Sequence, residues 1–354
     1  MRTHFAMGIL RCTALATGIL RRAAFTALAL AAVAHPALAG GKWTSFELGA
    51  TETILAGIND KGVVAGYYMG DDGEYSFLRT PDGTVTRFNV VQNEYTQVTA
   101  INRNGAVTGN YDYHHGFVRA PDGTITTFDP AYSIGTYPVA IDDKGAIAGY
   151  WYKQANGKFA GIRGFLRTPG GELKTFNVPR ALNTYAAAIN ASGVIAGSYD
   201  DKNNQWHGFV RSKDGALTTF SIPNVQTTNL AASGINAGGQ VVGYYSDSNY
   251  NTFGFLRSPD GTIAILDYSN GYFIPDTVPY GINDNGEVAG GYVDSSATHG
   301  FVRLPDGQVT TLDFPGNEDG TTALGINRKG QVVGYYLLGG PCTAYTFCGF
   351  VWRP

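Results

Sequence analysis

The chain has 354 residues, of which 15% are charged, and its net charge is −3. The chain has no excess of Lys and Arg that would attract phosphate groups, so we expect no nucleic-acid partner. The 48 Gly, 22 Tyr and 19 Phe instead favour short strands joined by tight turns.

The first residues predict a signal peptide over residues 1–39. Four arginines precede an apolar run, and a site of small residues suited to signal peptidase follows it (Arg2, Arg11, Arg21, Arg22; residues 23–34; residues 37–39). The apolar run has about 12 residues, whereas a membrane-spanning helix needs about 20, so a membrane anchor is the less favoured alternative. We expect cleavage before Gly40 and a secreted or periplasmic mature chain, residues 40–354, with no membrane span.

The mature chain contains one pattern seven times. Its clearest marker is a Phe-Leu/Val-Arg triplet, extended by a Trp in the last copy, that begins at Phe77, Phe117, Phe165, Phe209, Phe255, Phe301 and Phe350. A second marker is an Ile followed by Asn or Asp and soon by Gly, at Asn59, Asn102, Asp142, Asn190, Asn236, Asn283 and Asn327. The period of roughly 40 to 50 residues is typical of the four-stranded blades of β-propellers.

The sixth copy illustrates the four strands that we expect in each repeat. The predicted strands cover residues 277–282, 287–293, 300–303 and 308–314. The third and fourth strands are joined by Pro305-Asp306-Gly307, in which Pro presets φ and Gly accepts a positive φ. Because this turn falls between two apolar runs, it predicts a hairpin.

The two ends of the mature chain indicate how the repeats close. The last copy stops after its third strand, and residues 43–48 match the fourth-strand pattern of the other repeats. We expect this N-terminal strand to pair antiparallel with residues 348–353. The predicted fold is an all-β, seven-bladed β-propeller with four antiparallel strands per blade, and an open β-solenoid is the alternative. Closure removes exposed sheet edges, which suits a monomer.

The repeats resemble the HAF-type extracellular repeats of bacterial secreted proteins, which are named for a His-Ala-Phe triplet. The nearest matches are His115-Gly116-Phe117, His207-Gly208-Phe209 and His299-Gly300-Phe301. The resemblance covers residues 43–353, although Gly replaces Ala and the other four repeats lack the His. It implies the repeat fold and secretion, and it assigns no catalytic residue.

Two cysteines follow the predicted cleavage site, Cys342 and Cys348. In an oxidising compartment such a pair predicts a local disulfide. Metal binding is the alternative, but no His or third Cys lies nearby in the sequence. Two acidic stretches, residues 71–74 and 200–204, lack the alternating spacing of a calcium loop, so we expect no metal or cofactor.

Residues that recur in nearly every repeat are interpreted as scaffold. The seven arginines of the triplet, from Arg79 to Arg353, are expected to hydrogen-bond to the neighbouring turns. An anion-binding ring of these arginines is the alternative. The scaffold interpretation also covers His115, His207 and His299.

Function is expected on the loops that differ between repeats, which join second to third strands and successive repeats on one face. The candidate ligand-binding residues are the aromatic ones: Tyr75, Tyr113, Trp151, Tyr152, Trp206, Tyr250 and Tyr272. Aromatic rings beside carboxylates and amides suit stacking on sugars. The first hypothesis is therefore a module that binds a glycan or an extracellular protein.

An enzyme is the second hypothesis, and a structural role in the cell envelope is the third. The enzyme would be a polysaccharide lyase or hydrolase with its site at the axial opening of the same face. A lyase needs a cation to neutralise a uronate and a Tyr or His to move protons. The catalytic candidates are His114, Tyr152 and Arg163.

Overall fold

The computed structural model describes residues 41–48, 52–70, 73–92, 94–269, 276–317, 320–337 and 347–354. The chain divides into two units, Met1–Ala34 and His35–Pro354, and all described residues belong to the second. The predicted signal peptide, Tyr272 and Cys342 lie outside the described residues. Cys348 is buried in the last strand, and its pairing with Cys342 stays a prediction.

The described strands follow the sequence repeats, four strands to each repeat. The first strands are β2 (Glu52–Ile58), β6 (Thr96–Ile101), β10 (Ser133–Ile141), β14 (Ala181–Ile189), β18 (Asn229–Ile235), β22 (Asp276–Ile282) and β26 (Thr321–Ile326). The second strands are β3 (Val64–Gly70), β7 (Val107–Tyr111), β11 (Ile147–Ala155), β15 (Ile195–Asp201), β19 (Val241–Ser246), β23 (Val288–Val293) and β27 (Val332–Leu337).

The outer half of each repeat is built in the same way. The third strands are β4 (Gly73–Arg79), β8 (His115–Arg119), β12 (Lys158–Arg167), β16 (Trp206–Arg211), β20 (Thr252–Arg257), β24 (Thr298–Arg303) and β28 (Phe347–Arg353). The fourth strands are β5 (Val85–Phe88), β9 (Ile125–Phe128), β13 (Leu173–Phe176), β17 (Leu217–Phe220), β21 (Ile263–Leu266), β25 (Val309–Leu312) and, from the other end of the chain, β1 (Lys42–Phe46).

Pairing inside each repeat is antiparallel, so the predicted all-β class and the four-stranded antiparallel sheets are confirmed. Neighbouring sheets are joined by single parallel pairs at two places, Glu52 opposite Phe347 and Thr252 opposite Asp276. The N-terminal strand β1 pairs antiparallel with β28, and Ser45 lies opposite Phe350. The fourth strand of the last repeat is therefore supplied by the start of the described chain.

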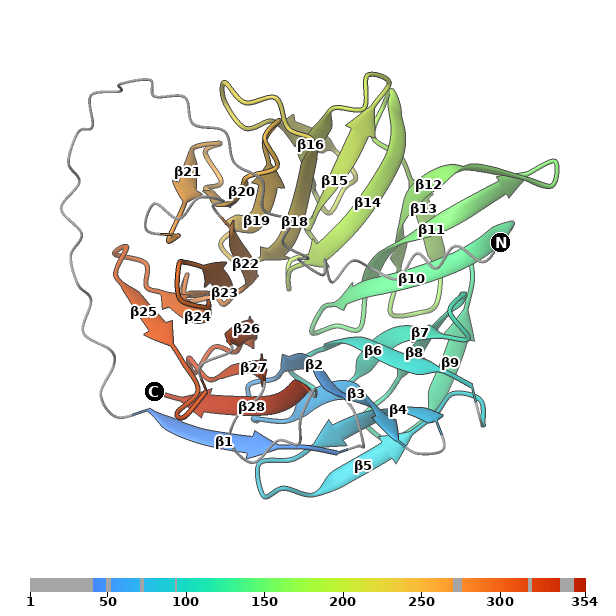
Figure 1. The fold of residues 1–354 in the computed structure, drawn as a ribbon. Coiled ribbons are helices and arrows are strands. Elements are labelled where there is room, and N and C mark those ends of the chain that lie inside the picture. Colours follow the sequence, from blue (N-terminus) through green and yellow to red (C-terminus); the bar gives the residue numbers. More distant parts are fainter. Residues whose placement is uncertain are drawn as a thin grey trace, which may run out of the picture. The chain divides into compact units, whose positions relative to one another are not determined.

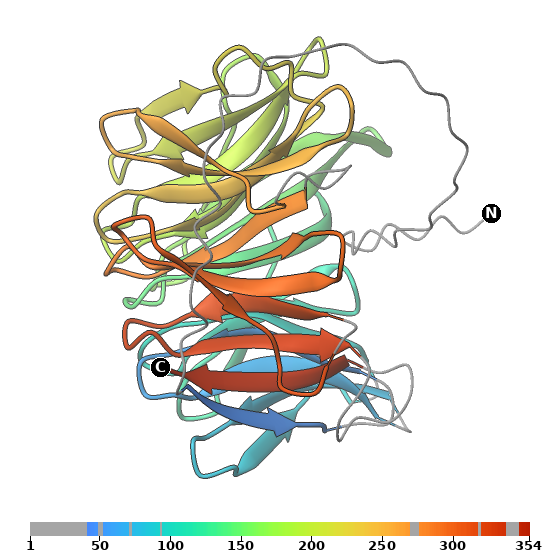
Figure 2. The same ribbon diagram turned by 60° about the vertical axis from the view of Figure 1, so that its left-hand side comes forward.

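The first strands lie nearest to the centre of the view in Figure 1, and fourth strands such as β1, β5, β21 and β25 lie at its periphery. Each first strand contacts the first strand of the next repeat, and β26 contacts β2 in the same way. Figure 2 shows the sheets of neighbouring repeats packed face to face. Seven hydrophobic clusters fill the spaces within and between these sheets.

The Phe of each sequence triplet forms the centre of its repeat. All seven are fully buried: Phe77, Phe117, Phe165, Phe209, Phe255, Phe301 and Phe350. A glycine of the second strand faces each ring across the sheet, and Gly149 is an example. A Cβ on Gly149 would lie 2.2 Å from the backbone oxygen of Tyr137 and 2.7 Å from the Phe165 ring. Glycine is therefore required where the sheet packs onto this ring.

In five repeats the Arg of the triplet packs on an aromatic ring of the preceding repeat. The Arg167 guanidinium carbon lies 5.0 Å above the Phe128 ring, while Phe165 contacts the same ring edge-on at 5.9 Å. Arg79, Arg119, Arg211 and Arg257 stack in the same way on Phe46, Phe88, Phe176 and Phe220. Four triplet arginines also donate to the backbone oxygen that opens the turn between the third and fourth strands: Arg119, Arg211, Arg257 and Arg303. The prediction that these arginines bond to the neighbouring turns is therefore confirmed for that turn, and the stacking of their planar faces on the preceding repeat is an additional contact.

Candidate functional site

The strands of each repeat end on two opposite faces. The turn face carries the short turns that join first to second and third to fourth strands. The loop face carries the connections between second and third strands and between successive repeats. The variable loops predict the working site on the loop face.

On the turn face, the repeated Asn or Asp closes its own turn and also reaches the next repeat. Asn102 Oδ1 accepts the backbone N–H groups of Asn104 and Ala106 at 3.1 and 2.9 Å. Asn102 Nδ2 donates to the backbone oxygen of Asp142, the equivalent residue of repeat three, at 2.9 Å. Five more amides donate in the same way: Asn59, Asn190, Asn236, Asn283 and Asn327. The last of these joins repeat seven to repeat one, and Asp142 alone of the seven has no amide hydrogen.

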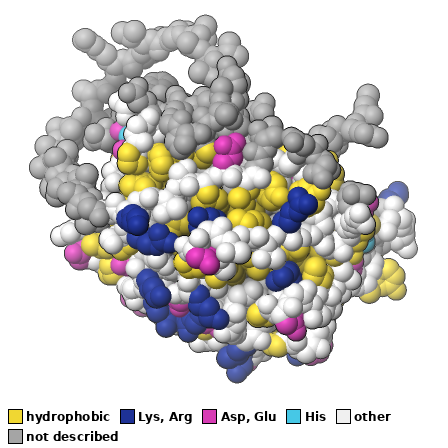
Figure 3. Space-filling view, turned by 90° about the horizontal axis from the view of Figure 1, so that it is seen from below, with side chains coloured by type: hydrophobic (Ala, Val, Ile, Leu, Met, Phe, Trp, Pro, Cys, Tyr) yellow, Lys and Arg dark blue, Asp and Glu magenta, His cyan; other side chains and the backbone are white. Residues whose placement is uncertain are grey.

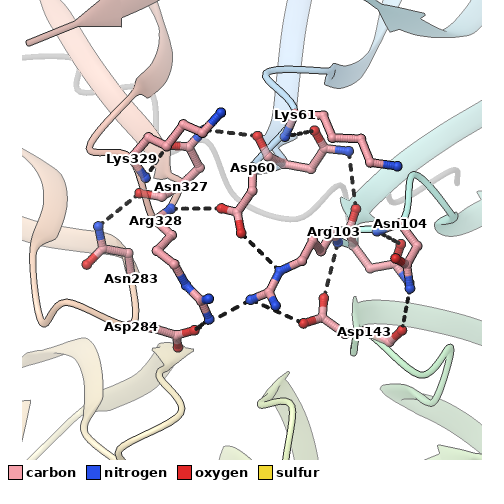
Figure 4. A network of polar contacts seen from close by, with 12 residues as sticks. Asp60, Lys61, Arg103, Asn104, Asp143, Asn283, Asp284, Asn327, Arg328 and Lys329 are labelled. Carbon is pink, nitrogen blue, oxygen red and sulfur yellow. Dashed lines mark hydrogen bonds and ion pairs between the residues drawn. The ribbon is translucent and has the colours of Figure 1, made fainter.

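The residue after this Asn or Asp is charged in five repeats, and these five side chains meet across the turn face (Figure 4). Arg103 Nε lies 2.9 Å from Asp60 Oδ2, and its NH2 group lies 3.4 Å from Asp143 and 3.8 Å from Asp284. Arg328 pairs with Asp284, and its backbone N–H donates to Asp60 at 3.0 Å. Burial opposes ionisation of Asp284, but the hydrogen bonds from Arg328 and from the backbone N–H of Ala237, together with the charges of Arg328 and Arg103, outweigh it and lower the pKa of this carboxyl.

A cavity of about 180 Å³ lies at this charged network and is lined by the turn residues and by isoleucines that end the first strands. Sequence analysis missed it, because the charges stand at turn positions that were treated as scaffold. Both guanidinium groups already pair with carboxylates. The network therefore links repeats one, two, three, six and seven, and we assign it a structural role.

The loop face carries a continuous series of aromatic rings in repeats three and four, which we call the aromatic row. Its members, in order, are Phe159, Tyr152, Tyr137, Tyr150, Tyr185 and Trp206. Successive ring centroids lie 5.1 to 6.0 Å apart. Phe159 stands near the tip of the β11–β12 hairpin and is 58% exposed. The row thus runs from an exposed tip to the half-buried Trp206.

A buried carboxylate is the second notable group near the loop face. Glu74 is 8% exposed, and its Oε2 accepts a hydrogen bond from Gln97 Nε2 at 3.1 Å. Its Oε1 has no hydrogen-bond partner among the described residues. Burial is the main reason that the pKa of Glu74 is raised to about 7. The hydrogen bond from Gln97 lowers this pKa, and the negative charge of Glu52 raises it. Burial, Glu74 and Glu52 also raise the pKa of Tyr67 to about 12.

The comparison with solved structures decides the fold. A streptogramin B lyase is 16% identical with a TM-score of 0.56, and the match covers 88% of this chain and 97% of the lyase. Virginiamycin B lyase from Staphylococcus aureus is 12% identical with a TM-score of 0.57, covering 89% and 99%. The β-propeller domain of the Trilobed protease from Pyrococcus furiosus is 11% identical with a TM-score of 0.55, covering 86% and 94%. The chain has a β-propeller fold.

At these identities the likeness shows the propeller fold alone. No protein-family model matches the chain, and no curated protein matches it either. The resemblance to the HAF-type repeats therefore rests on the sequence pattern.

The propeller places the predicted ligand-binding residues in different environments. Tyr113 and Tyr250 are exposed, at 47% and 78%. Tyr152 and Trp206 belong to the aromatic row, and Tyr75 is half-buried beneath Arg87. Trp151 differs from the expectation, because β11 turns its side chain into the core and leaves it 4% exposed. Its ring offers no open face for a ligand.

The three catalytic candidates do not form a constellation. His114 is exposed in the loop between β7 and β8, whereas Tyr152 packs between Tyr137 and Phe159. Arg163 donates to the backbone oxygens of Ile162, Leu182 and Ala160 at 2.8 to 3.2 Å. No hydrogen bond or ion pair joins the three side chains within the described ranges. Since its guanidinium caps backbone oxygens, Arg163 is poorly placed to neutralise a uronate.

Within the described part of the chain, no group of three or more His, Cys, Asp or Glu residues is arranged to hold a metal ion. No helix in that part is long and apolar enough to cross a membrane. On the side shown in Figure 3, Lys and Arg side chains form small groups separated by polar and hydrophobic ones. The surface charge on that side is locally mixed.

Proposed function

We propose that this protein is an exported, monomeric, seven-bladed β-propeller that binds a glycan along the aromatic row of its loop face. The observation that carries the proposal is the row itself. Tyr and Trp offer rigid apolar faces with polar edges, and such rings contribute large contact areas at a small loss of conformational entropy. Five rings of the row are exposed or half-buried and give a ligand several adjacent stacking positions, whereas Tyr150 is buried beneath them.

Polar groups beside the row support recognition of hydroxyl groups. Asp200 lies opposite Trp206 in the β15–β16 pair. Asp200 Oδ2 accepts a hydrogen bond from Asn183 Nδ2 at 3.0 Å, while Oδ1 is buried and has no partner among the described residues. Apolar faces with a few such polar groups are typical of sites that bind small ligands.

The closed seven-bladed ring is part of the proposal. Seven repeats of four strands, the contact of β26 with β2 and the bond from Asn327 to Asn59 support it. The pattern of the first 39 residues supports export. The alternative ligand for the same loop face is a protein partner.

Glycan arrays probed with the mature protein, followed by calorimetry on the selected glycan, test the proposal. Phe159→Ala removes an exposed ring of the row, and we expect at least tenfold weaker binding without a change in the melting temperature. Ile265→Ala is the matched control, because Ile265 is an exposed apolar residue of the outer strand β21. Equal affinities of the two variants, or no glycan bound by the wild type, would refute the proposal.

A lyase or hydrolase is the second candidate function, and Glu74 favours it. A carboxyl group whose pKa is about 7 can accept or donate a proton near neutral pH, and Tyr67 lies within its electrostatic influence. Two of the solved structures with this fold are lyases. If the protein degrades the glycan that it binds, Glu74→Gln should abolish new unsaturated or reducing ends and preserve binding.

A further inference from the structure

A cavity of about 410 Å³ lies at the loop face of repeat six, apart from the aromatic row. It is lined by Ser296, Ala297, Thr298, His299, Asp313, Asn317, Gly320 and Thr321. Most of these residues carry hydroxyl, carboxylate, amide or imidazole groups. The lining exposes apolar and polar surface in comparable amounts, so the cavity suits a small ligand that carries both kinds of group, such as a short-chain ester.

Three of the lining side chains stand in the order nucleophile, base and carboxylate. Ser296 Oγ lies 3.2 Å from His299 Nε2, and His299 Nδ1 lies 2.8 Å from Asp313 Oδ1. The His299 ring also stacks on Tyr292, with centroids 5.0 Å apart. Asp313 thereby fixes the ring orientation, and Nε2 is directed at the hydroxyl of Ser296. This is the arrangement by which a serine is activated for acyl transfer.

Repeats two and four have a His at the same position, so they show which contacts of His299 are common to several repeats and which occur in repeat six. His115 bonds to Asp129, and His207 bonds to Ser221, through the same Nδ1 atom at 2.7 and 2.8 Å. The bond from Nδ1 to the residue after the fourth strand is therefore a feature of the repeat. A serine at Nε2 occurs in repeat six and in neither of the other two, within the part of the chain that the structure describes.

Asp294 contacts both His299 and Ser296. Its Oδ1 lies 3.2 Å from His299 Nε2 and accepts the Ser296 hydroxyl at 2.6 Å. The hydrogen bond to Asp313 raises the pKa of His299. Burial lowers this pKa, and the contact with Asp294 raises it. A protonated His299 donates from both nitrogens and cannot take a proton from Ser296. Once His299 is neutral with its proton on Nδ1, Nε2 becomes the acceptor that faces Ser296 Oγ.

We propose that Ser296, His299 and Asp313 form a hydrolytic site for short-chain acyl esters of polyhydroxylated alcohols, and that Asp294 restrains it. Ser296 Oγ attacks the ester carbonyl carbon, and its proton moves to His299 Nε2. The ester C–O bond then breaks, and the leaving alkoxide takes that proton. Water attacks the acyl-serine, His299 accepts a proton from the water, and the acid leaves as Ser296 regains its hydrogen. Thr298 lines the cavity, and its hydroxyl is the proposed donor to the intermediate oxyanion.

Hydrolysis of p-nitrophenyl acetate by the purified mature protein tests the proposal. We expect Ser296→Ala and His299→Gln each to lower kcat/KM at least tenfold, and p-nitrophenyl octanoate to react more slowly than the acetate. His207→Gln is the matched control, because His207 holds the same position in repeat four, and it should keep the wild-type rate. A fluorophosphonate probe should label the peptide that contains Ser296. A wild-type rate in Ser296→Ala, or absence of the label, would overturn the proposal.

Asp294→Asn distinguishes a hydrolytic site from a purely structural cluster. Asn can still accept the backbone N–H of Ser296, which Asp294 holds at 2.7 Å, so the loop should keep its shape. Loss of the negative charge should release the Ser296 hydroxyl and let His299 lose its proton at lower pH. We expect a higher rate at pH 7 and a pH–rate profile shifted towards acid. An unchanged profile would show that Asp294 does not restrain the site.

Discussion

At the scale of single residues, the Phe-Leu/Val-Arg triplet joins neighbouring repeats through one shared ring. Arg167 is 8% exposed, and its guanidinium covers Phe128 of the preceding repeat. We expect Arg167→Ala to lower the free energy of unfolding by about 1 to 3 kcal/mol, because the cation–π contact and the packing of the alkyl chain are both lost. Chemical denaturation measures this change.

A double-mutant cycle identifies the ring as the partner of Arg167. Phe128→Leu keeps an apolar side chain and removes the ring, as Leu266 and Leu312 do at the ends of β21 and β25. If the ring contact carries the effect, Arg167→Ala should be less harmful in the Phe128→Leu background. Additive effects would place the stabilising contact of Arg167 elsewhere.

Asp142 offers a stabilising substitution. At the six equivalent positions an Asn donates to the backbone of the next repeat, and a carboxylate cannot. Asp142→Asn should supply the missing bond to repeat four and raise the free energy of unfolding by about 1 kcal/mol. Asn102→Asp removes one existing bond and should lower it by a similar amount. A neutral or destabilising Asp142→Asn would contradict this interpretation of the ring.

Glu74 should make stability depend on pH. Its pKa rises from 4.5 to about 7 on folding, so the folded chain holds this proton more tightly than the unfolded chain. The stabilisation is complete below about pH 4.5 and is lost as pH rises through about 7. Glu74→Gln should therefore stabilise the protein at pH 8 relative to wild type and have a smaller effect at pH 4.5. Unfolding free energies at the two pH values test this, and equal effects would contradict the shift.

At the scale of elements, β1 completes the last repeat from the opposite end of the chain. It pairs with β28, and Ser45 Oγ lies 2.7 Å from Tyr336 Oη, 291 residues away in the sequence. Trp43 packs on Phe314 and Phe350 with centroids 5.3 and 5.0 Å apart. Loss of β1 would expose both this packing and a sheet edge.

Deletion of residues 40–48 from the mature protein should lower the melting temperature sharply and promote association through β28. Differential scanning fluorimetry and size-exclusion chromatography measure the two effects. Deletion of residues 40 and 41, which precede β1, is the control and should leave both unchanged. A truncated protein as stable as the wild type would show that the strand is dispensable.

At the scale of the whole molecule, the repeated residues predicted the architecture well. The strands expected in repeat six at 277–282 and 287–293 are observed as Asp276–Ile282 and Val288–Val293. Turn residues and buried rings recur once in each repeat, so the sequence pattern that predicts a blade appears several times in one chain. The pairing of β1 with β28 followed from the missing fourth strand.

Partners between repeats could not be predicted in the same way. Nearly every repeat offers the same Arg, Phe and Asn, so the pattern does not say which copy contacts which. The bonds of the arginines to the neighbouring turns were predicted, whereas their stacking on the preceding repeat was not. Trp151 was taken for a loop residue because β11 extends further, to Ala155, than the second strands of other repeats. The Ser296 cluster was missed because its His stands at a scaffold position.

The join between β1 and β28 sets the order in which the molecule can be completed during synthesis. A ribosome delivers β1 before the strands of the six other repeats and delivers its partner β28 after them, so these six repeats can acquire all their strands before β1 can pair. The cost of bringing the ends together grows only with the logarithm of the intervening length. Completion is therefore a single late event, and until it occurs the nascent chain presents an unpaired N-terminal strand that needs shielding from other chains.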